Sequence, residues 1–381
     1  MTLPDEELDM LIAEAQELIA EPTEESNHGA RRSSVVKSIL RITKRVVYVL
    51  LETVLLIAIA LYGIMFVLAK GPSPTARDLF VLSVRETSAV GFLASLFFSE
   101  EEIAAIEQSE GVEEYEDTDT SLIVIPTDPP PGEDDAPKPD AWGLVDEDGD
   151  GIIVDTVKGE GFTGYMMVVL DPSRVIMASK VESFGIRGYT VAEMVEEFDA
   201  VAGINAGGFH DPDGRGNGSI PDTMVFYEGK SYYPLYGSAG GFVGLDSNHI
   251  MHVGKFTAQQ AKEKDIQYGV GFGPVLVSNG APVPSNVSGV NPRTGIGQRS
   301  DGAILMLVIE GRQVSSLGAT YQDMTEIFLS YGAVNACNLD GGSSSMMWYQ
   351  GDYINNCASV VGIRPIPTAF LVLKEGGNAN G

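Results

Sequence analysis

The chain has 381 residues, of which 53 are acidic and 24 basic, so its formal net charge is −29 at neutral pH. An acidic excess of this size repels nucleic acid and anionic lipid surfaces, and it argues against a nucleic-acid partner. Hydrophobic residues make up 44% of the sequence, which is enough for a packed core. The two cysteines, Cys337 and Cys357, are too few for a disulfide scaffold or a cysteine-rich metal site. They are enough for one disulfide bridge.

Residues 1–45 are predicted to form a cytoplasmic tail that is acidic at first and basic next to the following apolar run. Apolar residues recur at helical spacing in its first part, but a short isolated helix is marginal in water. The sequence assigns this tail no function and identifies no protein partner.

An apolar run at residues 46–69 is long enough to cross a hydrocarbon core about 30 Å thick as one helix. Its single charge, Glu52, lies near the start, where it can reach the interface. Six lysines and arginines precede the run between Arg31 and Arg45, whereas basic residues after it are dispersed. The positive-inside rule therefore predicts a single-pass protein of the cell membrane, with a cytoplasmic N-terminus and an extracellular remainder. A cleaved signal peptide is the alternative, which the length and late start of the run disfavour.

Residues 70–140 are predicted to be a helical stalk followed by an acidic, proline-rich linker. Ser99 with Glu102 forms a capping-box pattern that opens a short helix. Acid and proline dominate from residue 110 to residue 140, and such a composition cannot bury a core. We therefore expect an extended spacer.

Residues 141–374 are predicted to be the folded domain, followed by a disordered tail at 375–381. The pattern favours an α+β fold, with a mixed sheet as its core and flanking helices. Two helices are signalled by a threonine cap with an acid three residues later, at Thr190 and Thr320. The strand-like apolar runs are 164–170, 200–205, 303–309, 333–339 and 345–350.

The two helix–strand units resemble each other at a constant offset. Thr190, Met194, Glu196, Phe198, Asn205 and Ala206 match Thr320, Met324, Glu326, Phe328, Asn335 and Ala336 in that order. A glycine pair follows each unit, Gly207-Gly208 and Gly341-Gly342. Either the match is a coincidence of two helix–strand units, or two related units bring glycine-rich strand ends to one shared site.

Three glycine-containing segments carry residues suited to chemistry. In residues 205–218 a strand end opens into a loop rich in glycine and acid; residues 291–297 present Arg293 before a buried strand; and residues 338–345 place Asp340 at the end of an apolar strand. Glycine lets the backbone approach a ligand, so a carboxylate, a guanidinium and amides can converge. Each signal alone is weak, but their occurrence in one domain predicts a ligand site.

Together the three segments resemble the phosphodiester glycosidase family, relatives of the enzyme that removes N-acetylglucosamine from a sugar phosphodiester. The resemblance rests on NAGGF at 205–209, NPRT at 291–294 and LDGGSSS at 339–345, and it covers about the last half of the chain. Ser343 replaces the family's usual third glycine, and a long acidic insert follows Phe209. The resemblance implies a glycoside hydrolase that acts on a carbohydrate or sugar-phosphate polymer of the cell envelope or extracellular polysaccharide.

In a sugar 1-phosphodiester the leaving group is a phosphate, a weaker base than a sugar alkoxide, so neutralising its charge matters more than protonating it. The resemblance therefore implies that Arg293 binds the phosphate and that Asp340 acts at the anomeric carbon, as nucleophile, base or stabiliser. Asp211, Asp213 and His210 are candidates for a second acid–base group, with a solvated loop as the alternative.

The remaining candidates are predicted to bind substrate: Asn205, Gly207, Gly208, Asn291, Thr294, Gly341, Gly342 and Ser343. We expect the two asparagines to fix the loops by hydrogen bonds. We expect the amides of Gly341 and Gly342 to be able to hold an oxyanion.

The sequence requires no cofactor, and calcium is the one candidate ion. Asp146, Asp148 and Asp150 match the opening of a calcium loop, with Gly151 at the sixth position. Val157 stands at the twelfth position, where an EF-hand needs a bidentate glutamate, so an acidic turn is the alternative.

Two other classes of function stay open. The first is a non-catalytic module that uses the same cleft to bind anionic glycans or to help assemble exopolysaccharide. The second is a calcium-dependent adhesive domain. Only the enzyme requires Asp340 for turnover.

Overall fold

The computed structural model describes residues 24–87, 90–108, 117–126, 138–211, 216–232, 241–284, 288–359 and 362–376. The chain forms two compact units, which divide between Val67 and Leu68.

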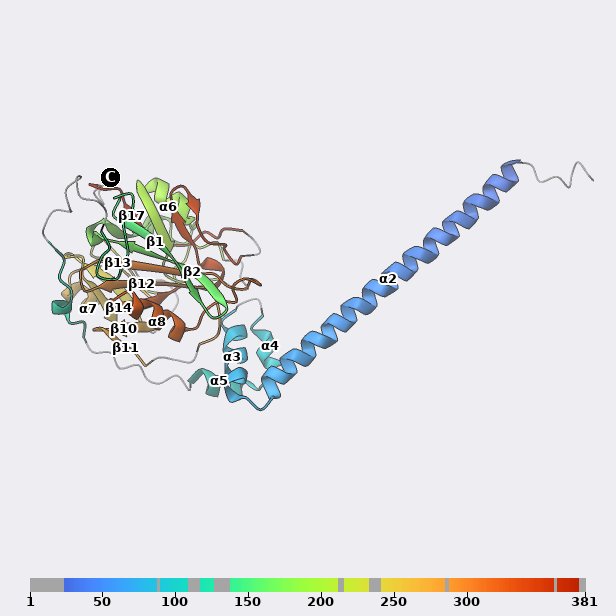
Figure 1. Cartoon of the computed structure of the whole chain (residues 1–381), viewed down its shortest axis with the longest axis horizontal. Coiled ribbons are helices and arrows are strands. Elements are labelled where there is room, and N and C mark those ends of the chain that lie inside the picture. Colours follow the sequence, from blue (N-terminus) through green and yellow to red (C-terminus); the bar gives the residue numbers. More distant parts are fainter. Residues whose placement is uncertain are drawn as a thin grey trace, which may run out of the picture. The chain divides into compact units, whose positions relative to one another are not determined.

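All described residues of the first unit belong to helix α2, Glu24–Lys70 (Figure 1). Its stretch Ile39–Lys70 is long and apolar enough to cross a membrane, and the most apolar part of it is wholly exposed. The core helix of a soluble domain would be buried, so length, composition and exposure all agree with the span predicted at residues 46–69. The helix predicted within the first residues of the tail lies outside the described residues.

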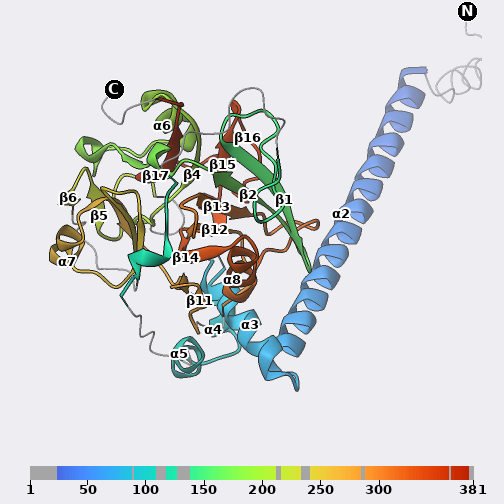
Figure 2. The same cartoon turned by 60° about the vertical axis from the view of Figure 1, so that its left-hand side comes forward.

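The second unit begins with three short helices, α3 (Pro74–Arg85), α4 (Phe92–Ser95) and α5 (Glu100–Gln108). The three helices lie next to one another (Figure 2). Their apolar side chains pack together, with Phe80 edge-on to Phe97. The predicted capping box is present, because Ser99 and Glu102 exchange hydrogen bonds between side chain and backbone. These helices, in the region predicted to be a stalk, belong to the same compact unit as the sheets.

Three antiparallel sheets form the body of this unit. In strand order, the first is β1-β2-β13-β12-β14-β10-β11, the second β16-β15-β4-β17-β3 and the third β6-β5-β9-β7-β8. Every strand pair among the described residues is antiparallel, which confirms the α+β class and replaces the expected mixed sheet.

The strand bounds confirm the five apolar runs read from the sequence. The first sheet comprises β1 Ile152–Gly159, β2 Phe162–Val169, β10 Val275–Ser278, β11 Ala281–Pro282, β12 Arg293–Arg299, β13 Ile304–Ile309 and β14 Ala333–Leu339. The second comprises β3 Val175–Ser179, β4 Ala200–Asn205, β15 Met347–Tyr349, β16 Asp352–Tyr353 and β17 Thr368–Leu373. The third comprises β5 Val225–Tyr227, β6 Lys230–Tyr232, β7 Phe242–Asp246, β8 Met251–Gly254 and β9 Ile266–Gly271.

One core is shared by all three sheets. Met306 of the first sheet, Phe370 of the second and Val243 of the third belong to the same buried cluster. The opposite face of each sheet is covered by one helix: α8 (Tyr321–Ser330), α6 (Val191–Glu197) and α7 (Ala258–Glu263), respectively. Both faces of the central strands are therefore buried, which explains why they read as continuous apolar runs rather than alternating ones.

All three covering helices begin with a capping box. Those at Thr190 and Thr320 confirm the sequence prediction, and Thr257 with Gln260 forms a third at the start of α7. Each box satisfies backbone donors at the helix start, so these short helices are held both by caps and by their buried faces.

The two cysteines are not bridged. The Cys337 thiol is buried in the shared core near the carbonyl oxygens of Phe272 and Pro274. The Cys357 thiol lies on a loop and donates to the carbonyl oxygen of Ser343 at 3.2 Å.

Candidate active site

The antiparallel register of three central strands brings distant residues to one sheet edge. Arg293, the first residue of β12, pairs with Ile309, the last residue of β13. Its neighbour Thr294 pairs with Leu339, the last residue of β14. The start of β12 therefore lies beside the ends of β13 and β14, so Arg293, Arg312 and Asp340 emerge at the same edge.

These residues open into one cavity of about 630 Å³. Its polar and charged lining comes from the two residues that follow α3, from the segment between β4 and β5, from the strand ends just described and from the segment before β17. The charged residues of this lining are Glu86, Asp211, Asp222, Arg293, Arg312, Asp340 and Arg364.

Asn205 joins the second sheet to the first beside Asp340. Its Nδ2 donates to the carbonyl oxygen of Asp340 at 2.6 Å, and its Oδ1 accepts from Thr294 Oγ1 at 2.9 Å and from the Met346 amide at 3.1 Å. Asn205 and Thr294 are both buried, so they hold the ends of the strands together and their polar atoms are committed to the protein.

The hypothesis of two glycine-rich strand ends at one site predicts that Gly207 and Gly341 flank one cleft. Gly341 lines the cavity together with Gly208, the second glycine of the first pair, whereas Gly207 is not among the described lining residues. The two matched asparagines, however, lie at different positions in their strands. Asn205 ends β4, whereas Asn335 lies near the start of β14 and donates to the carbonyl oxygen of Met251. The shared site therefore does not come from equivalent positions of two repeats.

Several motif glycines serve packing rather than ligand approach. A Cβ on Gly207 would lie 2.4 Å from Val270 Cγ2, and one on Gly295 or Gly297 would lie within 3.0 Å of Phe328 or Met324 of α8. The Gly342 amide donates to the carbonyl oxygen of Pro292, which removes it as an oxyanion donor and leaves this role to Gly341.

Asp340 is the carboxyl group with the most perturbed environment in the cavity. Burial raises its pKa from 3.8 to about 7; a hydrogen bond from Ser344 and the charge of Arg364 oppose this rise, while Asp222 and Asp211 add to it. A carboxyl group that titrates near neutrality in a cavity is typical of an acid–base or nucleophilic site.

This raised pKa has a consequence for stability. The folded state retains the Asp340 proton at pH values where the unfolded chain has lost it, so stability falls as the pH rises from about 4 to about 7. We expect Asp340→Asn to raise the free energy of unfolding at pH 8 by on the order of 2 kcal/mol, allowing for the solvent that reaches this carboxyl, and to change it little at pH 4. Denaturant unfolding followed by tryptophan fluorescence at both pH values measures the effect, with the exposed Asp352→Asn as control. Equal changes at both pH values would contradict it.

Asp211 is held by Arg364 rather than left open for acid–base chemistry. Arg364 Nη1 donates to Asp211 Oδ2 at 2.7 Å and to Ser343 Oγ at 3.1 Å. Burial alone would raise the pKa of Asp211, but the bonds from Arg364 and the Gly216 amide lower it below its usual value. Ser343, where the family usually has glycine, thus helps to orient this arginine.

Asp222 is the second carboxyl group with a raised pKa in the cavity. Burial raises its pKa, the charge of His210 opposes the rise and that of Asp211 adds to it. Its backbone amide bonds the Gly208 carbonyl oxygen, which folds the insert back onto the strand end. Of the earlier candidates, His210 is exposed and does not belong to the lining formed by described residues, and Asp213 lies outside the described residues.

Arg293 is only 4% exposed and is surrounded by acceptors. Its Nε donates to the Ala319 carbonyl oxygen at 3.0 Å, and its Nη2 donates to Glu86 Oε2 at 2.8 Å and to the Gly289 carbonyl oxygen. The charge of Arg293 is therefore neutralised by a carboxylate of the protein. The sequence had suggested instead that Arg293 is available to bind the phosphate.

Arg312 is the more open cation. Its Nη2 donates to Thr87 Oγ1 at 2.8 Å and to Asn291 Oδ1 at 3.1 Å, both of them uncharged acceptors. Burial of the guanidinium and the charge of Arg293 lower its pKa. No described carboxylate lies within 4.0 Å of it, and its Nε and Nη1 form no hydrogen bond with described residues, so it retains donors for an anion.

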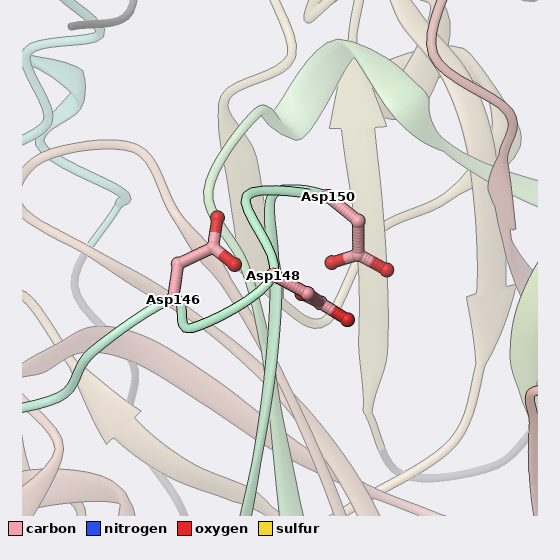
Figure 3. Close-up of side chains that lie close together, drawn as sticks. All are labelled: Asp146, Asp148 and Asp150. Atoms are coloured by element: carbon pink, nitrogen blue, oxygen red, sulfur yellow. The ribbon is translucent and has the colours of Figure 1, made fainter. Parts of the chain in front are cut away.

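The acidic loop before β1 lies apart from this cavity lining. Asp146, Asp148 and Asp150 lie on one loop, with one oxygen of each within 4.8 Å of the others (Figure 3). Asp146 accepts from the amides of Gly149 and Gly151, and burial, with the neighbouring aspartates, raises the pKa of Asp150. An acidic turn closed by its own backbone accounts for these contacts, and calcium binding stays a prediction.

The sequence analysis missed four charged residues of the cavity: Glu86, Asp222, Arg312 and Arg364. Arg312 carries a usable signal, because it comes shortly after the buried strand at 304–309, as Asp340 comes after the strand at 333–339. The other three reach the cavity from an N-terminal helix, a loop and a segment near the C-terminus, and no local pattern marks them.

The antiparallel α+β fold and the aspartate–arginine cavity at its strand ends define a phosphodiester glycosidase-like domain. Residues 198–373 match the family described as phosphodiester glycosidase. The match covers somewhat less than half of the chain, and it shows a likeness of this part to that family.

Similar proteins extend the comparison. The SPbeta prophage-derived uncharacterized protein YomE of Bacillus subtilis (strain 168) is 33% identical over 181 residues, which are 44% of this chain and 27% of that protein. The chain thus matches little more than a quarter of the length of this curated relative.

Two solved structures are also similar to the chain. One is the catalytic domain of zebrafish N-acetylglucosamine-1-phosphodiester alpha-N-acetylglucosaminidase auto-inhibited by its pro-peptide, with 16% identity, a TM-score of 0.48, and coverage of 58% of this chain and 82% of that one. The other is a hypothetical protein from Synechocystis, with 16% identity, a TM-score of 0.44, and coverage of 65% and 64%, respectively.

Proposed function

We propose that the protein is a membrane-anchored glycosidase that cleaves a sugar 1-phosphodiester, or a related glycosidic bond, in a carbohydrate or sugar-phosphate polymer outside the cytoplasm. The observation that carries the proposal is the convergence of Asp340 and Arg312 from adjacent strand ends into one cavity. The match of residues 198–373 to the phosphodiester glycosidase family supports the same reaction class.

In this reaction the bond between the anomeric carbon and the phosphate oxygen breaks, and the phosphate leaves with the electron pair. The water oxygen ends on the anomeric carbon. Asp340 acts at that carbon in its ionised form, as nucleophile, base or stabiliser of positive charge. Arg312 neutralises the phosphate as it leaves, through charge-assisted hydrogen bonds.

Asp222 is our candidate for the second carboxyl group. Its raised pKa suits an acid–base role, whereas Asp211 is kept ionised by its bond to Arg364. A phosphate leaving group needs little protonation, so the demand on this second group is smaller than in an ordinary glycosidase.

The orientation of the chain rests on the basic residues before the apolar span and not on the fold. These residues support a cytoplasmic N-terminus and a catalytic unit on the outer side of the membrane. Substrates of that compartment include the polymers of the cell envelope.

The test is release of free sugar by the full chain in detergent or nanodiscs, from sugar 1-phosphodiesters and from nitrophenyl glycosides. Because Asp340 acts ionised and has a pKa of about 7, kcat/KM is expected to rise through about pH 7 and then level off. No release at any pH, together with binding of sugar phosphates, would replace the enzyme with the non-catalytic glycan-binding module.

A further inference from the structure

Helix α3 lies outside the family domain, yet it reaches the cavity. Glu86, its C-terminal capping residue, and Thr87, the next residue, both line the cavity. The family match begins only at residue 198. Part of the ligand site is therefore supplied by the segment that follows the apolar helix.

The docking of α3 is close and specific. The amide of Val290 donates to Ser83 Oγ at 2.9 Å. A Cβ on Gly289 would lie 2.4 Å from the backbone of Ser83, so only glycine allows this approach without a shift. The helix is seated directly on the turn that precedes β12.

Glu86 uses both carboxylate oxygens in this contact. Its Oε2 accepts from Arg293 Nη2 and from Asn291 Nδ2, each at 2.8 Å, and its Oε1 accepts from the Gly289 amide at 3.0 Å. Arg293 is thereby neutralised, and the side chain of Asn291 is fixed with its Oδ1 toward Arg312.

Thr87 completes the arrangement on the side of Arg312. Its hydroxyl donates to the Ser83 carbonyl oxygen at 3.1 Å and accepts from Arg312 Nη2 at 2.8 Å. The side chain of Arg312 is thus held by two uncharged acceptors, Thr87 just after α3 and Asn291 within the family match.

We propose that α3 determines which arginine recognises an anionic ligand. Thr87 is a positioning residue that aims Arg312 into the cavity, and Glu86 is a positioning residue that neutralises Arg293 and withdraws it from the ligand. The ligand class, a sugar phosphate or phosphodiester, rests on the proposed function; the arrangement of the two arginines does not.

Substitutions at Thr87 and Glu86 are expected to change the affinity for an anionic ligand in opposite directions. Thr87→Val keeps the shape but removes the acceptor, so Arg312 loses its orientation. The Kd of glucose 1-phosphate is expected to rise about tenfold, as is the KM for a sugar 1-phosphodiester, while KM for a nitrophenyl glycoside stays within about twofold. Glu86→Gln removes the charge that neutralises Arg293, so glucose 1-phosphate should bind several-fold more tightly.

The experiment uses the full chain in nanodiscs, with glucose 1-phosphate titrated by calorimetry and both substrates assayed in parallel. Thr87→Ser restores the acceptor and is expected to bind like the wild type. Glu107→Gln is the matched control, because Glu107 of α5 pairs with Arg85 of α3 at 3.1 Å and does not line the cavity among the described residues.

The outcomes separate this inference from the proposed function. If no substrate is cleaved but glucose 1-phosphate binding responds to Thr87→Val and Glu86→Gln in opposite directions, the proposed function fails and the role of α3 stands. Unchanged binding in Thr87→Val, or an equal loss on both substrates, would overturn the role of Thr87. Weaker binding in Glu86→Gln would make Glu86 a structural anchor and overturn its role.

Discussion

Asp340→Asn is expected to abolish sugar release, lowering kcat by about a thousandfold or more, while the Kd of a sugar phosphate changes little. The amide cannot act as nucleophile or base and carries no charge to stabilise the anomeric centre. It keeps the size of the side chain, and the backbone bonds of residue 340 to Asn205 and Ala206 do not involve the carboxyl group. Sugar release and calorimetric binding, measured on the same preparations, test both halves of the prediction.

The matched control for this substitution is Asp352→Asn, on the exposed hairpin between β15 and β16. It should leave both kcat and Kd at wild-type values. If Asp340→Asn retains substantial turnover, the carboxyl group at the end of β14 is not the group that acts at the anomeric carbon. The raised pKa of Asp340 would then reflect burial alone.

Arg312→Gln is expected to raise KM for a sugar 1-phosphodiester by about ten- to a hundredfold, with a much smaller change for a nitrophenyl glycoside. The reason is that Arg312 faces uncharged acceptors and keeps donors for the phosphate, whereas Arg293 is neutralised by Glu86. Steady-state kinetics on the two substrates, which differ in the charge of the leaving group, measure the effect.

Arg187→Gln serves as the control, since Arg187 forms an exposed ion pair with Glu193 on α6. The comparison with Arg293→Gln is equally informative. That substitution leaves Glu86 partly buried without its cation, so we expect it to lower stability more than selectivity. If Arg293→Gln, and not Arg312→Gln, selectively loses activity on phosphodiesters, Arg293 is the residue that binds the phosphate.

The elements of the fold were largely readable from the sequence because their signals are local. Apolar runs mark the central strands, whose two faces are both buried, and threonine caps mark α6 and α8. The apolar span in α2 is likewise a property of a continuous segment. Strand direction was not readable in this way, because it depends on how the strands pair.

The position of Asp340 was also predictable, since a charged residue directly after a buried strand must emerge at the sheet edge. The roles of its neighbours were not. The Gly295 and Gly297 motif positions look like ligand-approach glycines, but they make room for Phe328 of α8. Asn205 fixes its surroundings by hydrogen bonds, as the sequence suggested, but only the structure shows that these bonds connect two sheets.

The sequence by itself determined the apolar span, the α+β class, and the segments that bring Asp340 and Arg293 to a common site. Only the tertiary structure decided that Glu86 neutralises Arg293, that Arg312 stays open and that Asp340 titrates near neutrality. The reason is physical. A local pattern specifies backbone geometry, whereas the charge state and availability of a side chain depend on burial and on partners that arrive from distant parts of the chain.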